Sequence, residues 1–159
     1  KYNQPKITRA MTSPTNDSNI ASFRLEGYRV VQSEIGLDID SETLQLQEPL
    51  QLHVRMDPKG STLDKEEHLL ILRMNTRVYS DKGEIEVKVS LVARFEYKAL
   101  QQDDLDEYIV YNAPAIIFPY VRAYISSLTG LSGISPIILP TLNMEKFGKK
   151  LLELLDEGK

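Results

Sequence analysis

The sequence predicts an α+β fold: a four-stranded antiparallel sheet covered on one face by a long helix, with a second, amphipathic helix at the C-terminus. Three observations predict it. Residues 84–97 alternate apolar and polar side chains, as a strand with one buried face does. Residues 115–129 place apolar side chains at helical spacing. Residues 144–157 combine an apolar stripe with a charged opposite side.

The chain has 159 residues, which is enough for one ordinary domain and short for two. We expect a flexible arm over residues 1–19, because this stretch is polar, contains two prolines and has no apolar period. A single domain is then expected over residues 20–159. The net charge of −4 and the scattered basic residues argue against nucleic-acid binding.

The composition also bounds the cellular setting. The chain contains no cysteine, which excludes disulfides and thiolate chemistry. No apolar run reaches the length of a membrane span, and the first residues lack the regions of a signal peptide. We therefore expect a cytoplasmic protein that does not insert into membranes.

The first two strands are expected over residues 20–35 and 44–56. In the first, Phe23 and Leu25 share a face and the alternation then continues in the opposite phase, so a bulge is predicted near Gly27. In the second, Pro49 interrupts the pattern, so the part before it is expected to form a separate crossing piece.

Two further strands are expected over residues 68–80 and 84–97, joined by a short hairpin over residues 81–83. Residues 57–60 have the composition of a turn. These connections are too short for parallel crossovers, so the sheet is antiparallel.

The remaining third of the chain supplies the cover for the sheet. Pro114 and Pro119 lack an N–H group, so we expect a short helical turn before Pro114 and the main helix from about Ala115 to Thr129. Gly130 and Gly133 are expected to end this helix.

A second helix is expected after an extended link. The apolar residues 134–142, with two prolines, are expected to form the link. Asn143 is then placed to cap a last helix over residues 144–157.

The chain carries few groups for catalysis or cofactor binding. His53 and His68 fall on different strands, which makes a poor metal site without cysteine. The carboxylates between residues 103 and 107 are expected to form a solvated helix start. We find no nucleophile motif and no phosphate-binding glycine loop. The sequence therefore predicts no enzyme, no metal and no cofactor.

Apolar residues in irregular and amphipathic segments are the remaining candidates for a site. They either complete the core or line a groove for an extended peptide or a partner, and the residues alone favour the core. The candidates for peptide binding are Leu44, Leu46, Ile137, Leu139, Met144, Phe147, Leu151 and Leu155.

The run Ile117-Phe118-Pro119-Tyr120-Val121-Arg122 resembles the L-F-P-Y-A-R motif of the SecB family of export chaperones. The resemblance continues through residues 123–128, the glycine turn and the Pro136–Pro140 segment. The order of strands and helices also resembles that family. Residues 33–37 depart from it, since they lack the aromatic-acidic-proline signature that members usually carry there.

The resemblance implies an ATP-independent holdase that binds unfolded preproteins in apolar grooves and passes them to the SecA motor. It implies a homo-oligomer, a dimer or a tetramer, and a groove between residues 37–46 and 137–155. Residues of the motif and the helix that follows would be core and oligomer contacts: Phe118, Pro119, Tyr120, Arg122, Tyr124, Ile125 and Leu128.

Two alternatives stay open at this point. The missing signature at residues 33–37 favours a structural or assembly protein that keeps the fold and has lost client binding. The third hypothesis is a dedicated chaperone of one partner, such as an antitoxin.

Overall fold

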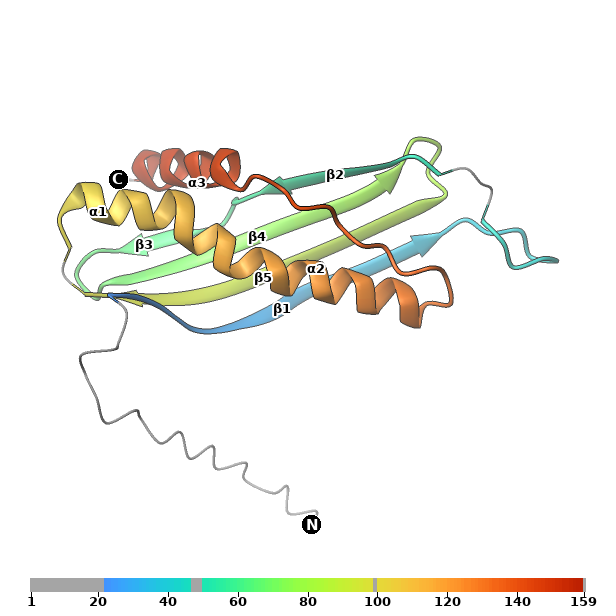
Figure 1. Cartoon of the computed structure of the whole chain (residues 1–159), viewed down its shortest axis with the longest axis horizontal. Coiled ribbons are helices and arrows are strands. Elements are labelled where there is room, and N and C mark those ends of the chain that lie inside the picture. Colours follow the sequence, from blue (N-terminus) through green and yellow to red (C-terminus); the bar gives the residue numbers. More distant parts are fainter. Residues whose placement is uncertain (1–21, 47–49, 99, 159) are drawn as a thin grey trace, which may run out of the picture.

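The computed structural model describes residues 22–46, 50–98 and 100–158, so the arm expected over residues 1–19 lies outside the described residues. Figure 1 shows the order of the elements along the chain. They are β1 (Phe23–Leu37), β2 (Leu52–Asp57), β3 (Thr62–Asp64), β4 (Leu69–Ser80), β5 (Ile85–Tyr97), α1 (Gln102–Glu107), the π-helical segment η2 (Tyr108–Asn112), α2 (Ala113–Leu131) and α3 (Glu145–Glu157).

The sheet is antiparallel throughout, and its strands lie in the order β1-β5-β4-β2. These are the four predicted strands, which confirms the predicted fold class. The short strand β3 is an addition that pairs with the start of β4. Periodicity missed β3 because three residues are too few to display an alternation.

The bulge predicted near Gly27 is confirmed. The register between β1 and β5 shifts between Leu25 and Gly27, and it shifts a second time between Val30 and Gln32. The two shifts keep Phe23, Leu25, Val30 and the later apolar residues of β1 on the helix-covered face, despite the change of phase in the sequence.

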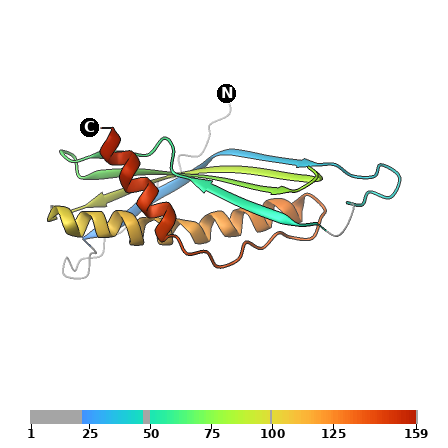
Figure 2. The ribbon, with the colours of Figure 1, turned by 90° about the horizontal axis from the view of Figure 1, so that it is seen from above.

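The molecule has two layers, with the sheet on one side and the helices on the other (Figure 2). Alternate residues of β4 and β5 face the helices and are buried, among them Leu72, Leu91 and Phe95. Helix α2 runs across β5 and β1 and covers this face. The predicted pairing of one buried face with one covering helix is therefore confirmed.

The start of the long helix differs from the prediction. Helix α2 begins at Ala113, directly after η2, and it passes through Pro119 without a break. Pro119 and Ala115, whose carbonyl lies four residues earlier, are both exposed, so water can reach the carbonyl that lacks a helical partner. Pro114 stands in the first turn, where proline is tolerated. The two prolines therefore did not separate a turn from a helix.

Helix α2 ends near the predicted glycines. Its last residue is Leu131, and Gly133 follows with a φ of 87°, a conformation that suits glycine after a helix end. The last helix begins one residue later than predicted, at Glu145, whose N–H donates to the Asn143 side chain at 3.0 Å.

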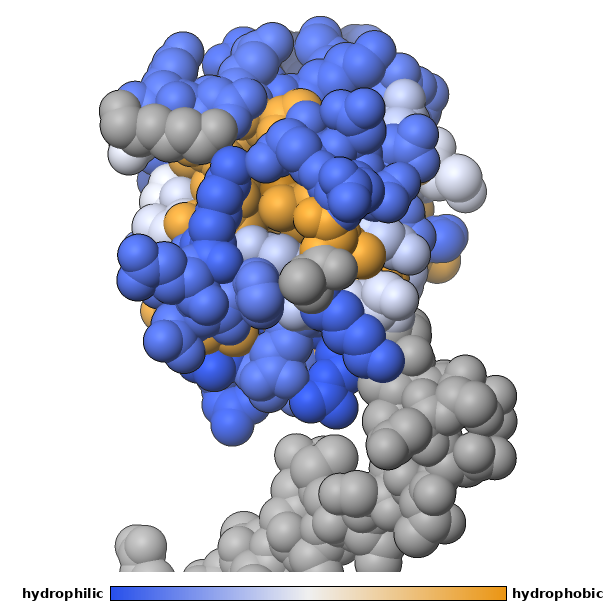
Figure 3. Space-filling view, turned by 90° about the vertical axis from the view of Figure 1, so that its left-hand side faces the viewer, coloured by the Kyte–Doolittle hydropathy of each residue, from blue (hydrophilic) through white to orange (hydrophobic). Residues whose placement is uncertain are grey.

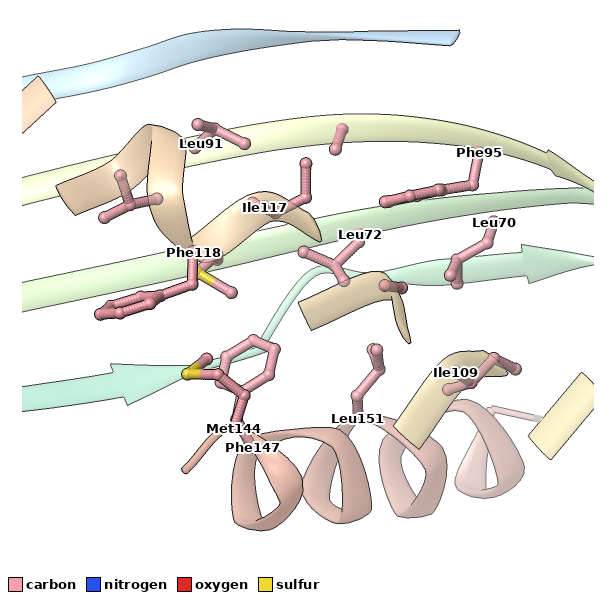
Figure 4. Packing of buried hydrophobic residues seen from close by; sticks show 14 of the residues in the cluster. Leu70, Leu72, Leu91, Phe95, Ile109, Ile117, Phe118, Met144, Phe147 and Leu151 are labelled. Atoms are coloured by element: carbon pink, nitrogen blue, oxygen red, sulfur yellow. The ribbon is translucent and has the colours of Figure 1, made fainter. Parts of the chain in front are cut away.

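Helix α3 packs across η2 and α2 and contacts β2. In Figure 4, Phe118 of α2 lies beside Met144 and Phe147, and Leu151 points toward the sheet. The four side chains are at most 8% exposed. The apolar stripe of α3 therefore completes the core. Among the described residues, no helix combines the length and the apolar character needed to cross a membrane.

Candidate functional site

A hollow of about 730 Å³, lined mostly by leucine and isoleucine residues, lies at the end of the sheet where β1 and α2 end. Its walls come from four parts of the chain that are far apart in sequence. Residues 44–46 follow β1, Leu50 and Leu52 lie at the start of β2, Ile85 opens β5, and residues 133–138 follow α2. The hollow therefore exists only in the folded chain.

The first wall is a tight loop after β1. The Asp40 carboxylate accepts hydrogen bonds from the N–H groups of Thr43 at 2.7 Å and Glu42 at 3.0 Å, and from the Thr43 hydroxyl. These hydrogen bonds, from Thr43 first and then Glu42, hold the pKa of Asp40 below its ordinary value. The turn places Leu44 at a φ of 57°, which costs a non-glycine residue about 1 kcal/mol. Leu44 is left 72% exposed at the hollow.

The opposite wall is the extended link after α2, and two hydroxyl groups of the helix hold it. The Ser126 hydroxyl donates to the Ile137 carbonyl at 2.9 Å. The Thr129 hydroxyl accepts from the Ile137 N–H at 2.9 Å and donates to the Ile125 carbonyl at 2.8 Å. Both backbone groups of Ile137 are thus bound to α2, and the side chains of Ile137 and Ile138 both line the hollow, Ile138 being 67% exposed.

The hollow also lies beside a sheet edge. Within the described residues, β2 is an edge strand that pairs with β4 alone, and Leu50 and Leu52 at its start line the hollow. An unpaired edge offers backbone groups to an extended chain, and apolar pockets beside it take alternate side chains. The arrangement can therefore hold a short extended apolar segment.

The structure separates the predicted peptide-binding residues into two groups. Leu44, Leu46 and Ile137 come together at the hollow. The other five lie on the buried side of the link and of α3, each at most 8% exposed, and belong to the core. These five are Leu139, Met144, Phe147, Leu151 and Leu155.

The predicted motif residues divide in a similar way. Phe118 and Ile125 belong to the core, whereas Pro119 is exposed and Arg122 and Leu128 are half-buried.

Two tyrosines of the motif tie α2 to the edge strand β1. The Tyr120 ring packs on Tyr28 with ring centroids 4.6 Å apart, and the Tyr124 hydroxyl donates to the Ser33 hydroxyl at 2.9 Å. Both rings of the first pair are about 40% exposed, so aromatic surface lies open along this edge.

A second hollow of about 790 Å³ lies at the other end of the molecule, between β3 and the end of α3. Figure 3 looks at this end and shows apolar side chains framed by hydrophilic ones. Leu63, Leu154 and Leu155 line the hollow together with polar residues of 61–66. Leu155, which the sequence proposed for peptide binding, thus borders this second hollow while its side chain is largely buried.

The titratable groups form surface pairs. The His53 ring pairs with the Asp81 carboxylate, and His68 lies against the Tyr97 ring with centroids 5.4 Å apart. In the part of the chain that the structure describes, no three His, Asp or Glu side chains come together as metal ligands would.

Sequence reasoning missed Ser126 and Thr129, which position the link. Their spacing of three residues on α2 was the available signal, because hydroxyls at i and i+3 lie on one side of a helix.

A model of the SecB family, described as preprotein translocase subunit SecB, matches residues 38–151. The matched range contains both walls of the first hollow. An uncharacterised protein of Methanocaldococcus jannaschii is 26% identical over 141 residues, which cover 86% of this chain and 89% of that protein.

The protein-export protein SecB of Azoarcus sp. is 26% identical over 97 residues, which cover 60% of this chain and 64% of that protein. The alignment thus spans less than two thirds of that relative. Among solved structures, a SecB-like chaperone of Mycobacterium tuberculosis, in complex with a ChAD peptide from the HigA1 antitoxin, superposes with a TM-score of 0.63 at 16% identity. This match covers 76% of this chain and 91% of that chain, and it concerns the fold.

Proposed function

The chain belongs to the SecB family, and from this premise we propose that it is a non-enzymatic, ATP-independent chaperone that holds unfolded polypeptide in the hollow that residues 44–46, Leu50 and Leu52 line on one side and residues 133–138 on the other. The observation that carries the proposal is the open hollow, most of whose lining residues are leucine and isoleucine. Its two most exposed leucine and isoleucine side chains, Leu44 and Ile138, line it from separate loops, and neither contributes to the buried core.

The hollow offers contacts that do not depend on the sequence of the bound chain. An extended chain gains free energy from apolar burial and from backbone hydrogen bonds at a sheet edge, and neither requires a particular sequence. Burial of one leucine-sized side chain contributes about 1.5–3 kcal/mol. A hollow that holds a few such side chains gives weak, reversible binding, which suits a protein that must release its client.

The proposal also includes assembly of the chain into an oligomer and transfer of the bound preprotein. A homo-oligomer, a dimer or a tetramer, is supported by the long edge strand β1 and by the open aromatic surface of Tyr28 and Tyr120 beside it. Transfer of an unfolded preprotein to the SecA motor in the cytoplasm is the export role that the resemblance to the SecB family implies. Solution mass measured with and without bound peptide tests the first point.

The main test is suppression of aggregation. A chemically unfolded substrate is diluted in the presence of equimolar chain, and light scattering is followed. We expect the unaltered chain to suppress scattering and the double variant Leu44→Ser, Ile138→Ser to lose most of this activity, because it removes two exposed apolar contacts from the hollow.

The matched control is Val31→Ser on β1. Val31 is 51% exposed and lies outside the hollow, so loss of exposed apolar area there should leave suppression unchanged. If the folded, assembled chain fails to suppress scattering of any substrate, the proposal fails and an assembly role without clients remains.

A dedicated chaperone of one partner is the second candidate. The solved complex of the M. tuberculosis protein with an antitoxin peptide motivates it. Affinity purification separates the two: one protein bound in equal amounts through the hollow supports the dedicated role, and a broad set of unfolded proteins supports the general one.

A further inference from the structure

Three cationic side chains stand side by side on the face of the sheet that the helices leave open. Lys88 of β5 lies directly opposite Arg77 of β4, and Arg77 lies directly opposite Arg55 of β2. Residues that are directly paired project from the same face. Arg77 and Lys88 alternate with buried neighbours that face the helices, so the row Arg55–Arg77–Lys88 points away from the core.

The row carries an electrostatic cost for the isolated chain, because like charges directly opposite each other are destabilising. It is nevertheless held in place. The guanidinium carbon of Arg77 lies 4.4 Å from the centroid of the Tyr79 ring, and that of Arg55 lies 5.7 Å from it. One aromatic ring therefore orders two guanidinium groups, which lowers the entropy cost of binding an anion between them.

A carboxylate already fits between two members of the row. Glu86 accepts from Arg77 at 2.9 Å through Oε2 and from Lys88 at 2.9 Å through Oε1. Arg55 makes no ion pair with any residue that the structure describes. Arg55 and Arg77 lie on neighbouring strands, a little under 5 Å apart, as Arg77 and Lys88 do. No carboxylate of the described residues forms ion pairs with both Arg55 and Arg77.

The surroundings limit the kind of anion that fits. Glu34 lies directly opposite Lys88 at one end of the row, and Asp57 follows two residues after Arg55 at the other. A nucleic-acid backbone extends past three cations and would meet these carboxylates, whereas one or two acidic side chains would not. The chain's own N-terminal residues do not complement the row, since Lys1, Lys6 and Arg9 outweigh Asp17.

We propose that the row Arg55–Arg77–Lys88 docks an acidic segment of a partner protein. Carboxylates two residues apart in an extended segment stand about 7 Å apart, and the three cations span about 10 Å, so such a pair falls within the row. The row is on the opposite face of the sheet from the helices, so this docking is separate from the binding of clients in the hollow.

The test uses the full chain and a fluorescein-labelled Ser-Glu-Ser-Glu-Ser peptide, followed by fluorescence anisotropy at about 20 mM and about 200 mM salt. We expect saturable binding that weakens with salt. Arg55→Gln and Lys88→Gln are each expected to weaken it about tenfold, because each removes a charge-assisted contact. Circular dichroism checks that these exposed substitutions leave the fold intact.

Three controls make the outcome decisive. Arg24→Gln removes a cation from the same face outside the row, in an ion pair with Glu96, and should change binding less than twofold. The peptide with Gln in place of Glu should not bind, and Leu44→Ser, Ile138→Ser should bind the acidic peptide normally. Absence of saturable binding, an equal loss in Arg24→Gln, or tighter binding of a single-stranded oligonucleotide through the same row would each overturn the proposal.

Discussion

Gly148 of α3 lies against the backbone of Val110 in η2, so close that a Cβ atom on Gly148 would stand 1.9 Å from the Val110 carbonyl oxygen. Pro114, four residues after Val110, has no N–H group to donate to that carbonyl. The π-helical turn, the proline and the glycine therefore meet at one point, where the last helix crosses the long one.

Gly148→Ala should detach α3 from this crossing. Alanine favours a helix by about 1 kcal/mol over glycine, but the clash is with backbone and requires the helix to move. We expect a net loss of about 2 kcal/mol or more in the free energy of unfolding, measured by urea denaturation. Gly158→Ala is the control, since its Cβ would meet nothing closer than 3.8 Å and its stability should be unchanged.

Thr129→Val should loosen the wall of the hollow. The buried Thr129 hydroxyl is the acceptor for the Ile137 N–H, and its loss leaves that group without a partner, at a cost of about 1–3 kcal/mol. Hydrogen exchange at the Ile137 amide should accelerate. Thr129→Ser keeps the hydroxyl and should preserve slow exchange, and equal exchange in the two variants would contradict this role.

Pro119→Ala should stabilise the chain. Proline inside a helix costs about 3 kcal/mol relative to alanine, and part of this is offset because proline restricts the unfolded chain. We expect a gain of about 2 kcal/mol by urea denaturation. The reverse change four residues later on the same exposed side, Ala123→Pro, should destabilise by about 3 kcal/mol. A loss of stability in Pro119→Ala would indicate that the proline ring itself makes a needed contact.

Acid should weaken the open face of the sheet. Hydrogen bonds from Arg77 and then Lys88 hold the pKa of Glu86 below its ordinary value of 4.5. Because the folded-state pKa is the lower one, the stabilisation is present above pH 4.5 and disappears as the pH falls through the folded value.

Urea midpoints measured from about pH 7 to about pH 3 should fall less steeply in Glu86→Gln than in the unaltered chain. The control is Glu66→Gln, because Glu66 is exposed and lies outside the ion pairs of the described residues. If both variants follow the same acid profile as the unaltered chain, the Glu86 pairing contributes nothing to stability.

The strands were the most predictable part of the fold. Residues 84–97 alternate without a break, and β5 occupies Ile85–Tyr97. The phase change around Gly27 was enough to place the first bulge of β1. Both predictions succeed because a period of two residues directly states which side chains share a face.

The start of the long helix was less predictable, because the rule that proline breaks a helix does not account for the structure around each proline. Two prolines argued for a break, yet η2 and the exposed position of Pro119 let one helical run extend from Gln102 to Leu131. No local sequence pattern predicts a π-helical turn. The residue that packs against this turn, Gly148, lies far along the chain from it.

The candidate site was likewise predictable only in part from the sequence. The sequence by itself determined the antiparallel sheet, its buried face, the two covering helices and the apolar character of the residues near the hollow, because these follow from local periodicity. Only the tertiary structure decided that Leu44 and Ile137 line an open hollow while Phe147 and Leu151 fill the core. It also decided that Arg55, Arg77 and Lys88 form one row, because strand order and register, rather than sequence spacing, bring separate segments together.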